Sequence, residues 1–203
     1  MSWLQTTISI GLGTAVLVSV SLPLSAADIY AFDKGHTEII FKWNHVGLST
    51  QSGEFRDFDG TVSFDRENLA NSSVEVTIKA ASIDTGVKDL DDHLKSADFF
   101  EVETYPDITF KSTSVKQTGV DRGEVTGDLT IHGVTKSVSL DVKLQFEGDH
   151  PLGPFIEAYA GAPYVAFSGR TEILRSDFGV GAFAPLTSDH VEIVIETEMR
   201  QQN

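Results

Sequence analysis

The sequence contains no cysteine among its 203 residues. This absence excludes disulfide bonds, a thiol nucleophile and a zinc site built on thiolates. Basic residues are also scarce, because 15 Lys and Arg stand against 30 Asp and Glu and leave a formal net charge of −15. A chain this acidic repels phosphate backbones, so we expect no nucleic-acid partner. The same charge favours solubility.

Charge of either sign is missing from residues 1–27. The stretch from Ile8 to Leu24 is mostly apolar, and small residues at 25–27 precede Asp28. This pattern predicts a secretory signal peptide cut after Ala27, although the basic residues of a usual leader are absent. The alternative is an uncleaved membrane anchor, which requires about 20 consecutive apolar residues, and this run is shorter than that. No later segment approaches a membrane span, and we expect residues 28–203 to form one domain.

Motifs of the common enzyme classes are absent as well. The chain has no G-x-S-x-G elbow, no phosphate-binding loop and no dinucleotide fingerprint. Its six His are scattered without H-x-H or H-x-x-x-H spacing, so no metal site is predicted. The cluster DLDDHL at 89–94 reads as a solvated helix face and does not fit a calcium loop. We therefore expect no catalytic residue, no metal and no cofactor.

Alternating apolar residues dominate the chain after position 28 and predict eight strands. A change of parity between Phe55 and Phe58 predicts a bulge in the second strand. Helical spacing of Val87, Leu90 and Leu94 predicts a short helix in the 84–104 connection. The strands are expected at 36–47, 53–65, 73–80, from Ile108 onward, 124–133, 137–146, 164–173 and 190–199.

Long, evenly spaced antiparallel strands in one small all-β domain predict an eight-stranded barrel in preference to a sandwich, whose strands are shorter. The interior of such a barrel is filled by its own side chains or holds one small ligand. Both readings remain open for the stripe Val138, Leu140, Val142, Leu144 and Phe146. If the interior is a pocket, strand parity predicts its wall: Ile39, Phe41, Trp43, Phe55, Val76, Ile78, Phe110, Leu129 and Phe167.

The ends of the barrel hold further candidates. Two adjacent Phe cannot both face inward on a strand, so one of Phe99 and Phe100 is expected to close an end, as a moving lid or as a fixed plug. Phe178 and Phe183 are expected to play the same part at a rim. His45 shares the parity of the apolar face and is a candidate polar contact at the mouth, or is simply paired with backbone.

Two arginines are also candidates for contact with a head group. Arg170 and Arg175 lie near the end of a predicted strand, where a guanidinium can hold an anion. Salt bridges to the many carboxylates are the alternative for both.

Several stretches in order resemble the YceI-like family, including HTEIIFKWNHVG, SADFFEVETYPDITF and GDLTIHGVTK. The resemblance covers nearly all of residues 28–203. It implies a lipocalin-like barrel, exported to the bacterial periplasm, that holds an isoprenoid chain of a quinone, a polyprenyl lipid or a similar amphiphile without enzymatic activity. The loop at 149–161 and the uncharged leader are this chain's own.

Three functions are compatible with these observations. The leading one is a periplasmic carrier of a polyisoprenoid lipid or quinone-type ligand. A rival is a secreted acidic, stress-related interaction module, which predicts a barrel filled by its own side chains. The third is an enzyme in which His45 or Arg175 acts on a bound head group. The sequence does not fix the ligand or the oligomeric state, and a homodimer is possible.

Overall fold

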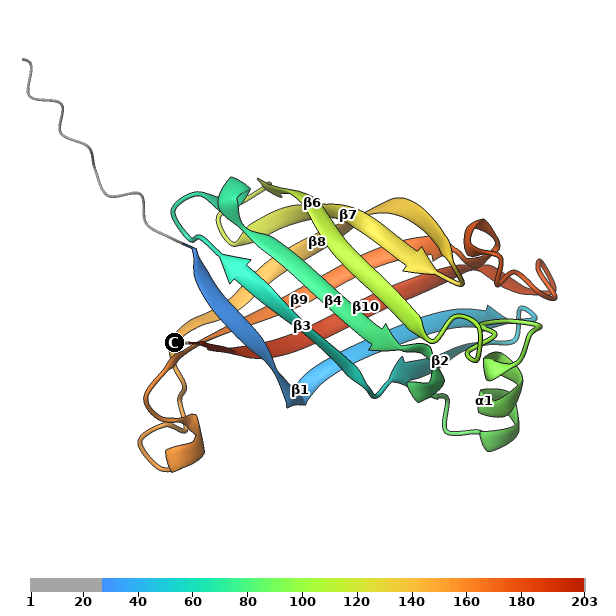
Figure 1. The fold of residues 1–203 in the computed structure, drawn as a ribbon, viewed down its shortest axis with the longest axis horizontal. Helices are drawn as coiled ribbons and strands as arrows, with labels where there is room; N and C mark the ends of the chain where they lie inside the picture. The colour runs from blue at the N-terminus through green and yellow to red at the C-terminus, as the bar shows by residue number, and fades with distance from the viewer. Residues whose placement is uncertain (1–26, 203) are drawn as a thin grey trace, which may run out of the picture.

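The computed structural model describes residues 27–202, so the predicted signal peptide at 1–27 lies almost wholly outside the described residues. Ten strands form one antiparallel sheet (Figure 1). The strands are β1 (Asp28–His45), β2 (Ser49–Phe55), β3 (Phe58–Phe64), β4 (Ser73–Lys79), β5 (Ile83–Asp84), β6 (Asp107–Gln117), β7 (Arg122–Ile131), β8 (Val134–Asp149), β9 (Pro163–Leu174) and β10 (Thr187–Gln201).

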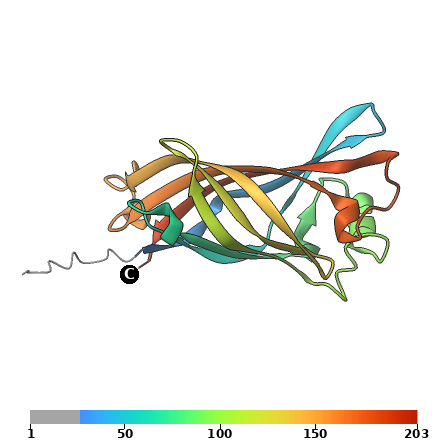
Figure 2. The ribbon, with the colours of Figure 1, turned by 90° about the horizontal axis from the view of Figure 1, so that it is seen from above.

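Eight of these strands close into a barrel, which confirms the predicted fold class. The circuit runs β1-β3-β4-β6-β7-β8-β9-β10, and the pairing of β10 with β1 closes it, for example at Ile39 opposite Ile195. Strands β2 and β5 lie outside the circuit, because β2 pairs with the second half of β1 and then with β5. Figure 2 shows the β1–β2 hairpin reaching past the barrel.

Strand β1 serves two neighbours because it bends. Residues 28–31 pair with β3, whereas residues 40–45 pair with β2. On the other side, the register with β10 shifts between Phe32 and Thr37, which leaves residues 33–36 as a bulge opposite Glu198. A bulge bends a strand in this way by adding residues that have no partner.

The second predicted strand is divided. A bulge was expected between Phe55 and Phe58, but the pairing breaks at residues 56–57 and the run becomes β2 and β3. The change of parity was predicted at the right position. At that point the strand changes its pairing partners instead of forming a bulge. Side chains of Phe55 and Phe58 are both buried as a result.

One short α-helix, α1 (Lys88–Lys95), lies at one end of the barrel, as predicted for the 84–104 connection (Figures 1 and 2). The remaining helical turns are 3₁₀: Leu69–Asn71, Ala80–Ser82, Glu157–Tyr159 and Arg175–Phe178. Among residues 27–202, no helix is long and apolar enough to cross a membrane.

Candidate ligand-binding site

The barrel encloses a cavity of ≈ 520 Å³ with an almost wholly apolar lining. Its side chains therefore do not fill the bore. Every strand of the closed circuit contributes to the wall, as expected when alternate residues face inward. One inward residue from each is Ile39, Val62, Val76, Phe110, Leu129, Leu140, Phe167 and Ile193.

The structure places nearly all of the sequence-predicted site residues on this cavity. Those that line it are Ile39, Phe41, Trp43, His45, Phe55, Val76, Ile78, Phe99, Phe100, Phe110, Leu129, Phe167 and Phe183. Phe178 is the exception, because it is only 2 % exposed, belongs to the main hydrophobic core cluster and does not line the cavity. The 3₁₀ turn at Arg175–Phe178 directs Phe178 into that core, so the expectation that it forms part of the rim is wrong.

The stripe on β8 divides as well. Val138, Leu140, Val142 and Leu144 line the cavity, whereas Phe146 does not. The register between β8 and β9 shifts between Leu144 and Phe146, and this shift changes the direction of the side chain. Sequence reasoning had left the whole stripe open between core and wall.

Aromatic rings form a continuous series from the mouth into the wall. The rings of Trp43 and Phe41 stack with centroids 5.6 Å apart, and Phe41 lies 5.4 Å from Phe55. Phe55 in turn meets Phe100 edge to face at 5.9 Å. Because each ring is held by the next, this part of the wall is stiff before any ligand arrives.

Phe99 and Phe100, both of them predicted site residues, line the cavity, but the assumption that they lie on a strand is wrong. Residues 97–104 form turns after α1. The amide of Phe99 donates to Ser96 O at 3.1 Å, and the amide of Phe100 donates to Leu94 O at 3.0 Å. This compact turn lets two consecutive rings reach the same space.

A group of three rings stands at the α1 end of the cavity. His93 meets Phe99 edge to face at 5.1 Å and Phe183 at 6.0 Å, and Phe99 lies 6.1 Å from Phe183. These rings come from α1, the following turn and the 179–186 loop. Phe183 is 58 % exposed, so the group borders solvent.

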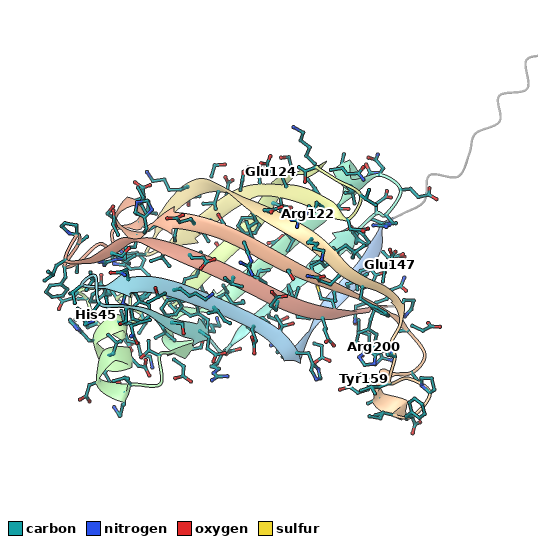
Figure 3. All side chains as sticks on the ribbon, turned by 180° about the vertical axis from the view of Figure 1, so that it is seen from behind. His45, Arg122, Glu124, Glu147, Tyr159 and Arg200 are labelled. Carbon is teal, nitrogen blue, oxygen red and sulfur yellow. The ribbon has the colours of Figure 1, made fainter. Side chains whose placement is uncertain are left out.

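Two hydroxyl groups on the cavity wall are hydrogen-bonded to each other. The hydroxyls of Thr37 and Thr197 lie 2.9 Å apart and are buried. The two hydroxyls are partners of each other, so neither is left unpaired in the cavity wall. Of the candidate polar residues, His45 is exposed at the mouth and lies opposite Thr187 in the β1–β10 register. Figure 3 shows it at the end of the molecule away from Arg122.

Arg175 has a role that the sequence did not indicate. All five of its N–H donors bind the segment at 180–188: Nε to Ser188 O (2.7 Å), Nη1 to Val180 O (2.9 Å) and Ala182 O (2.8 Å), and Nη2 to Thr187 O (3.0 Å) and Oγ1 (2.8 Å). Burial lowers the pKa of this guanidinium, with Asp189 opposing the shift. Arg175 therefore holds no free donor for a head group and no salt bridge; it fixes the loop that carries Phe183.

Arg170 forms a salt bridge, the alternative given for it above, since it lies 3.9 Å from Glu192 in an exposed ion pair. At the end of the cavity away from α1, Arg66 also lines the wall and reaches Asp121 and Glu147, each at 3.4 Å. Pairs this exposed contribute about 0–1 kcal/mol each.

Sequence reasoning missed part of the wall. Leu90 and Leu94 of α1, Val115 and Val125 of the β6–β7 hairpin, and Ile193 and Ile195 of β10 all line the cavity. The alternation that selected the other wall residues also marks the strand positions. The contribution of α1 depends on how the helix docks, which its spacing does not specify.

Fold and cavity together define an eight-stranded antiparallel barrel with an internal apolar chamber. The family model for the YceI-like domain matches residues 30–199, so the chain belongs to this family, and the resemblance seen in the sequence is confirmed. A relative named Protein YceI from Escherichia coli O157:H7 is 40 % identical over 195 residues, covering 95 % of this chain and 97 % of the relative.

Solved structures agree with this assignment. The crystal structure of BcnA from Burkholderia cenocepacia has a TM-score of 0.72 and 27 % identity, covering 82 % of this chain and 98 % of that one. A polyisoprenoid-binding domain from Saccharophagus degradans has a TM-score of 0.64 at 14 % identity, covering 87 % of this chain and 99 % of that one. The second likeness shows the shared fold alone.

Proposed function

We propose that this protein is a non-enzymatic carrier that holds the isoprenoid tail of a quinone, a polyprenyl lipid or a similar amphiphile inside its barrel. The observation that carries the proposal is the apolar cavity of ≈ 520 Å³. Membership of the YceI-like family and the name of the distant polyisoprenoid-binding neighbour support the same ligand class. The rival module with a self-filled barrel disagrees with this cavity.

The volume sets the length of tail that fits. A cavity of about 150 Å³ holds benzene, which is about 25 Å³ per carbon. On that scale ≈ 520 Å³ accommodates about 20 carbons, or four isoprene units. Each buried methylene contributes about 0.8 kcal/mol, so a filled cavity supplies about 16 kcal/mol before the costs of association are subtracted.

The head group belongs at the α1 end in this proposal. Trp43, His45 and His93 line the cavity there, and His45 is exposed. A tail that enters between these residues leaves its polar end in contact with water and with imidazole donors. One chain supplies the whole wall, so the proposal does not require a homodimer. The proposal includes export to the periplasm, which rests on the prediction of a signal peptide at residues 1–27.

The proposal is tested with benzoquinones that carry linear isoprenoid tails of one to eight units. Trp43 is the single Trp in residues 28–203, and quenching of its fluorescence reports binding near the mouth. We expect affinity to rise with each unit up to about four units and then to level off. A tailless quinone is the control and should not bind. Affinity that does not depend on tail length would refute the carrier.

Extraction of the protein purified from its native host gives a second test. Mass measurement under native conditions, followed by identification of the released compound, should show a polyprenyl chain. Clean apo-protein that also takes up no added polyprenyl lipid would count against the proposal.

A further inference from the structure

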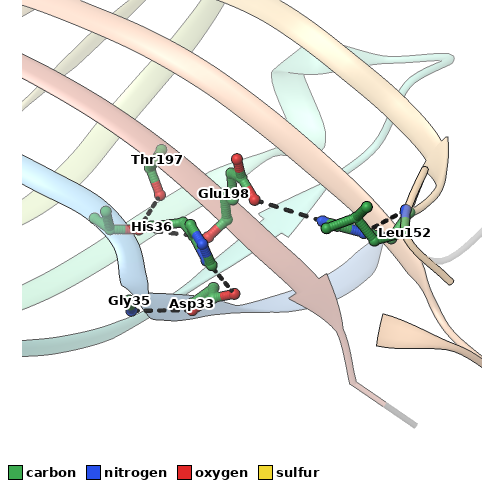
Figure 4. A network of polar contacts seen from close by, with 8 residues as sticks. Asp33, Gly35, His36, Leu152, Thr197 and Glu198 are labelled. Atoms are coloured by element: carbon green, nitrogen blue, oxygen red, sulfur yellow. Dashed lines mark hydrogen bonds and ion pairs between the residues drawn. The ribbon is translucent and has the colours of Figure 1, made fainter. Parts of the chain in front are cut away.

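A cluster of two carboxylates and one imidazole lies on the outside of the barrel, at the bend of β1. Asp33 and His36 are in the bulge, and Glu198 is on β10 directly opposite. One ligand-type atom from each of the three lies within 4.8 Å of the others, the only such group found among residues 27–202. Figure 4 shows the three side chains converging from the two strands.

We propose that Asp33, His36 and Glu198 form a binding site for a divalent transition-metal ion such as Zn²⁺. The inference is independent of lipid binding, because the site lies outside the cavity wall. An imidazole with two carboxylates is a donor set that Zn²⁺ accepts, with water in the fourth position. Ca²⁺ is a poor fit, since it prefers six to eight oxygens.

The distances are close to those that a bound ion requires. Zn²⁺ binds nitrogen at about 2.0–2.1 Å and carboxylate oxygen at about 2.0–2.2 Å, which separates neighbouring tetrahedral ligands by about 3.4 Å. His36 Nδ1 and Asp33 Oδ2 lie 3.0 Å apart, slightly closer than this. The other separations are at most 4.8 Å, so a bound ion would have to bring those atoms closer together.

Neighbouring groups already orient the ligands. The amide of Gly35 donates to Asp33 Oδ1 at 3.0 Å, which leaves Oδ2 directed at His36. Such an outer contact on a ligating carboxylate is typical of metal sites.

His150 supports the cluster from the other side. Its ring is 12 % exposed, stacks on Tyr159 at 4.1 Å and lies with Nε2 3.7 Å from Glu198 Oε2. The amide of Leu152 donates to its Nδ1 at 3.1 Å, so the neutral ring carries its proton on Nε2. His150 thus packs beside Glu198 and limits the positions that its carboxylate can take, and the proposed metal ligands are the other three.

Other His–carboxylate pairs of the described chain provide matched controls. His93 lies 3.1 Å from Asp98 at the α1 end, with exposure similar to that of His36, but no third ligand joins that pair. A substitution at His93 removes the same kind of pair and leaves the cluster at the β1 bend intact.

The test is a titration of the metal-free protein with Zn²⁺ in competition with a chromophoric chelator. We expect one ion per chain. His36→Ala should weaken binding at least 100-fold, Glu198→Gln, which keeps the shape, at least 10-fold, and His150→Ala about 10- to 100-fold, as outer-shell changes do. His93→Ala should have no effect. Zn²⁺ should raise the Tm of the unchanged protein and not that of His36→Ala, whose fold is checked by circular dichroism.

Three results would overturn the site. One is the lack of saturable binding in the unchanged protein. The second is equal weakening by His93→Ala and His36→Ala, which would assign the ion to scattered surface groups of an acidic protein. The third is displacement of Zn²⁺ by a tenfold excess of Ca²⁺, because a site of oxygen ligands alone behaves in that way.

Discussion

Gly169 offers a way to fill the cavity one carbon at a time. It lies on β9 between Val142 of β8 and Ile195 of β10, and it is buried on the cavity wall. A Cβ added there would lie 3.6 Å from Ile195 Cβ and 3.8 Å from Leu140 Cδ2, which is ordinary van der Waals contact. Larger side chains extend from that point into the bore, so the series Gly169→Ala, Gly169→Val and Gly169→Leu adds one, three and four carbons.

The expected loss of affinity follows from the volume. Each added carbon displaces about 25 Å³ and so excludes about one carbon of the ligand. At about 0.8 kcal/mol per methylene, the three variants lose about 0.8, 2.4 and 3.2 kcal/mol of binding to a four-unit tail. These values correspond to about 4-, 60- and 200-fold weaker binding. Tryptophan quenching by an isoprenoid quinone measures the series.

Stability should move in the opposite direction. Glycine in a strand is destabilising by about 0.5–1 kcal/mol relative to alanine, so the substituted proteins should keep or raise their Tm. Arg170→Leu, at the neighbouring outward position, adds a Leu to the outer surface and should leave affinity unchanged. If the Gly169 series keeps full affinity, the tail does not occupy this part of the bore, and the proposed mode of binding fails.

Three further predictions concern the rim and the loops. Arg175→Lys keeps the charge but cannot make all five hydrogen bonds, so it should destabilise the protein by about 1.5–3 kcal/mol. Faster hydrogen exchange of the amides in residues 180–188 would show that the loop has loosened. An unchanged exchange rate would contradict the role of Arg175 in fixing this loop. Phe183→Ala removes a ring from the α1 end of the cavity and should increase the rate of ligand release several-fold in stopped-flow measurements. Little change in Tm is expected, because the side chain is 58 % exposed. An unchanged release rate would favour a fixed plug formed by Phe99 and Phe100. Asp65 accepts a hydrogen bond from Asn71 Nδ2 at 2.8 Å and two more from backbone amides, which lower its pKa. The contribution of Asp65 to the free energy of unfolding is complete above the unfolded pKa of about 3.9 and is lost as the pH falls through the folded pKa. Asp65→Asn should therefore reduce the dependence of stability on pH on the acid side, and equal slopes for the two proteins would contradict this.

Strand periodicity was sufficient to predict the barrel and to select a set of side chains that line its interior. Alternation at Ile39, Phe41 and Trp43 has one physical meaning, because residues two apart on a strand face the same side. Closure then follows from the number and length of the strands. Pattern alone did not decide whether the interior was packed or hollow, since apolar side chains suit both. That answer depends on the sum of side-chain volumes in a bore of a given radius, which only coordinates provide.

The failures have a common cause in local backbone geometry. Phe99 and Phe100 share one space because a turn replaces the assumed strand, and Phe178 points into the core because of a 3₁₀ turn. Arg175 meets five groups of a loop whose path no periodicity describes. Likewise, no spacing rule relates His36 to Glu198, because their proximity arises from barrel closure and a bulge.

The departure from eight regular strands adds an aromatic side chain from outside the circuit to the cavity wall. Phe55 belongs to β2, which is outside the closed circuit, yet its ring packs between Phe41 of β1 and Phe100 of the turn after α1. Phe55 is the one residue of β2 that lines the cavity, and the residues of β2 before it are polar or glycine. A barrel with a single unbroken second strand would end its wall at the rim. Here the division of that strand at residues 56–57 lets the buried ring of Phe55 reach the cavity wall from a strand outside the circuit.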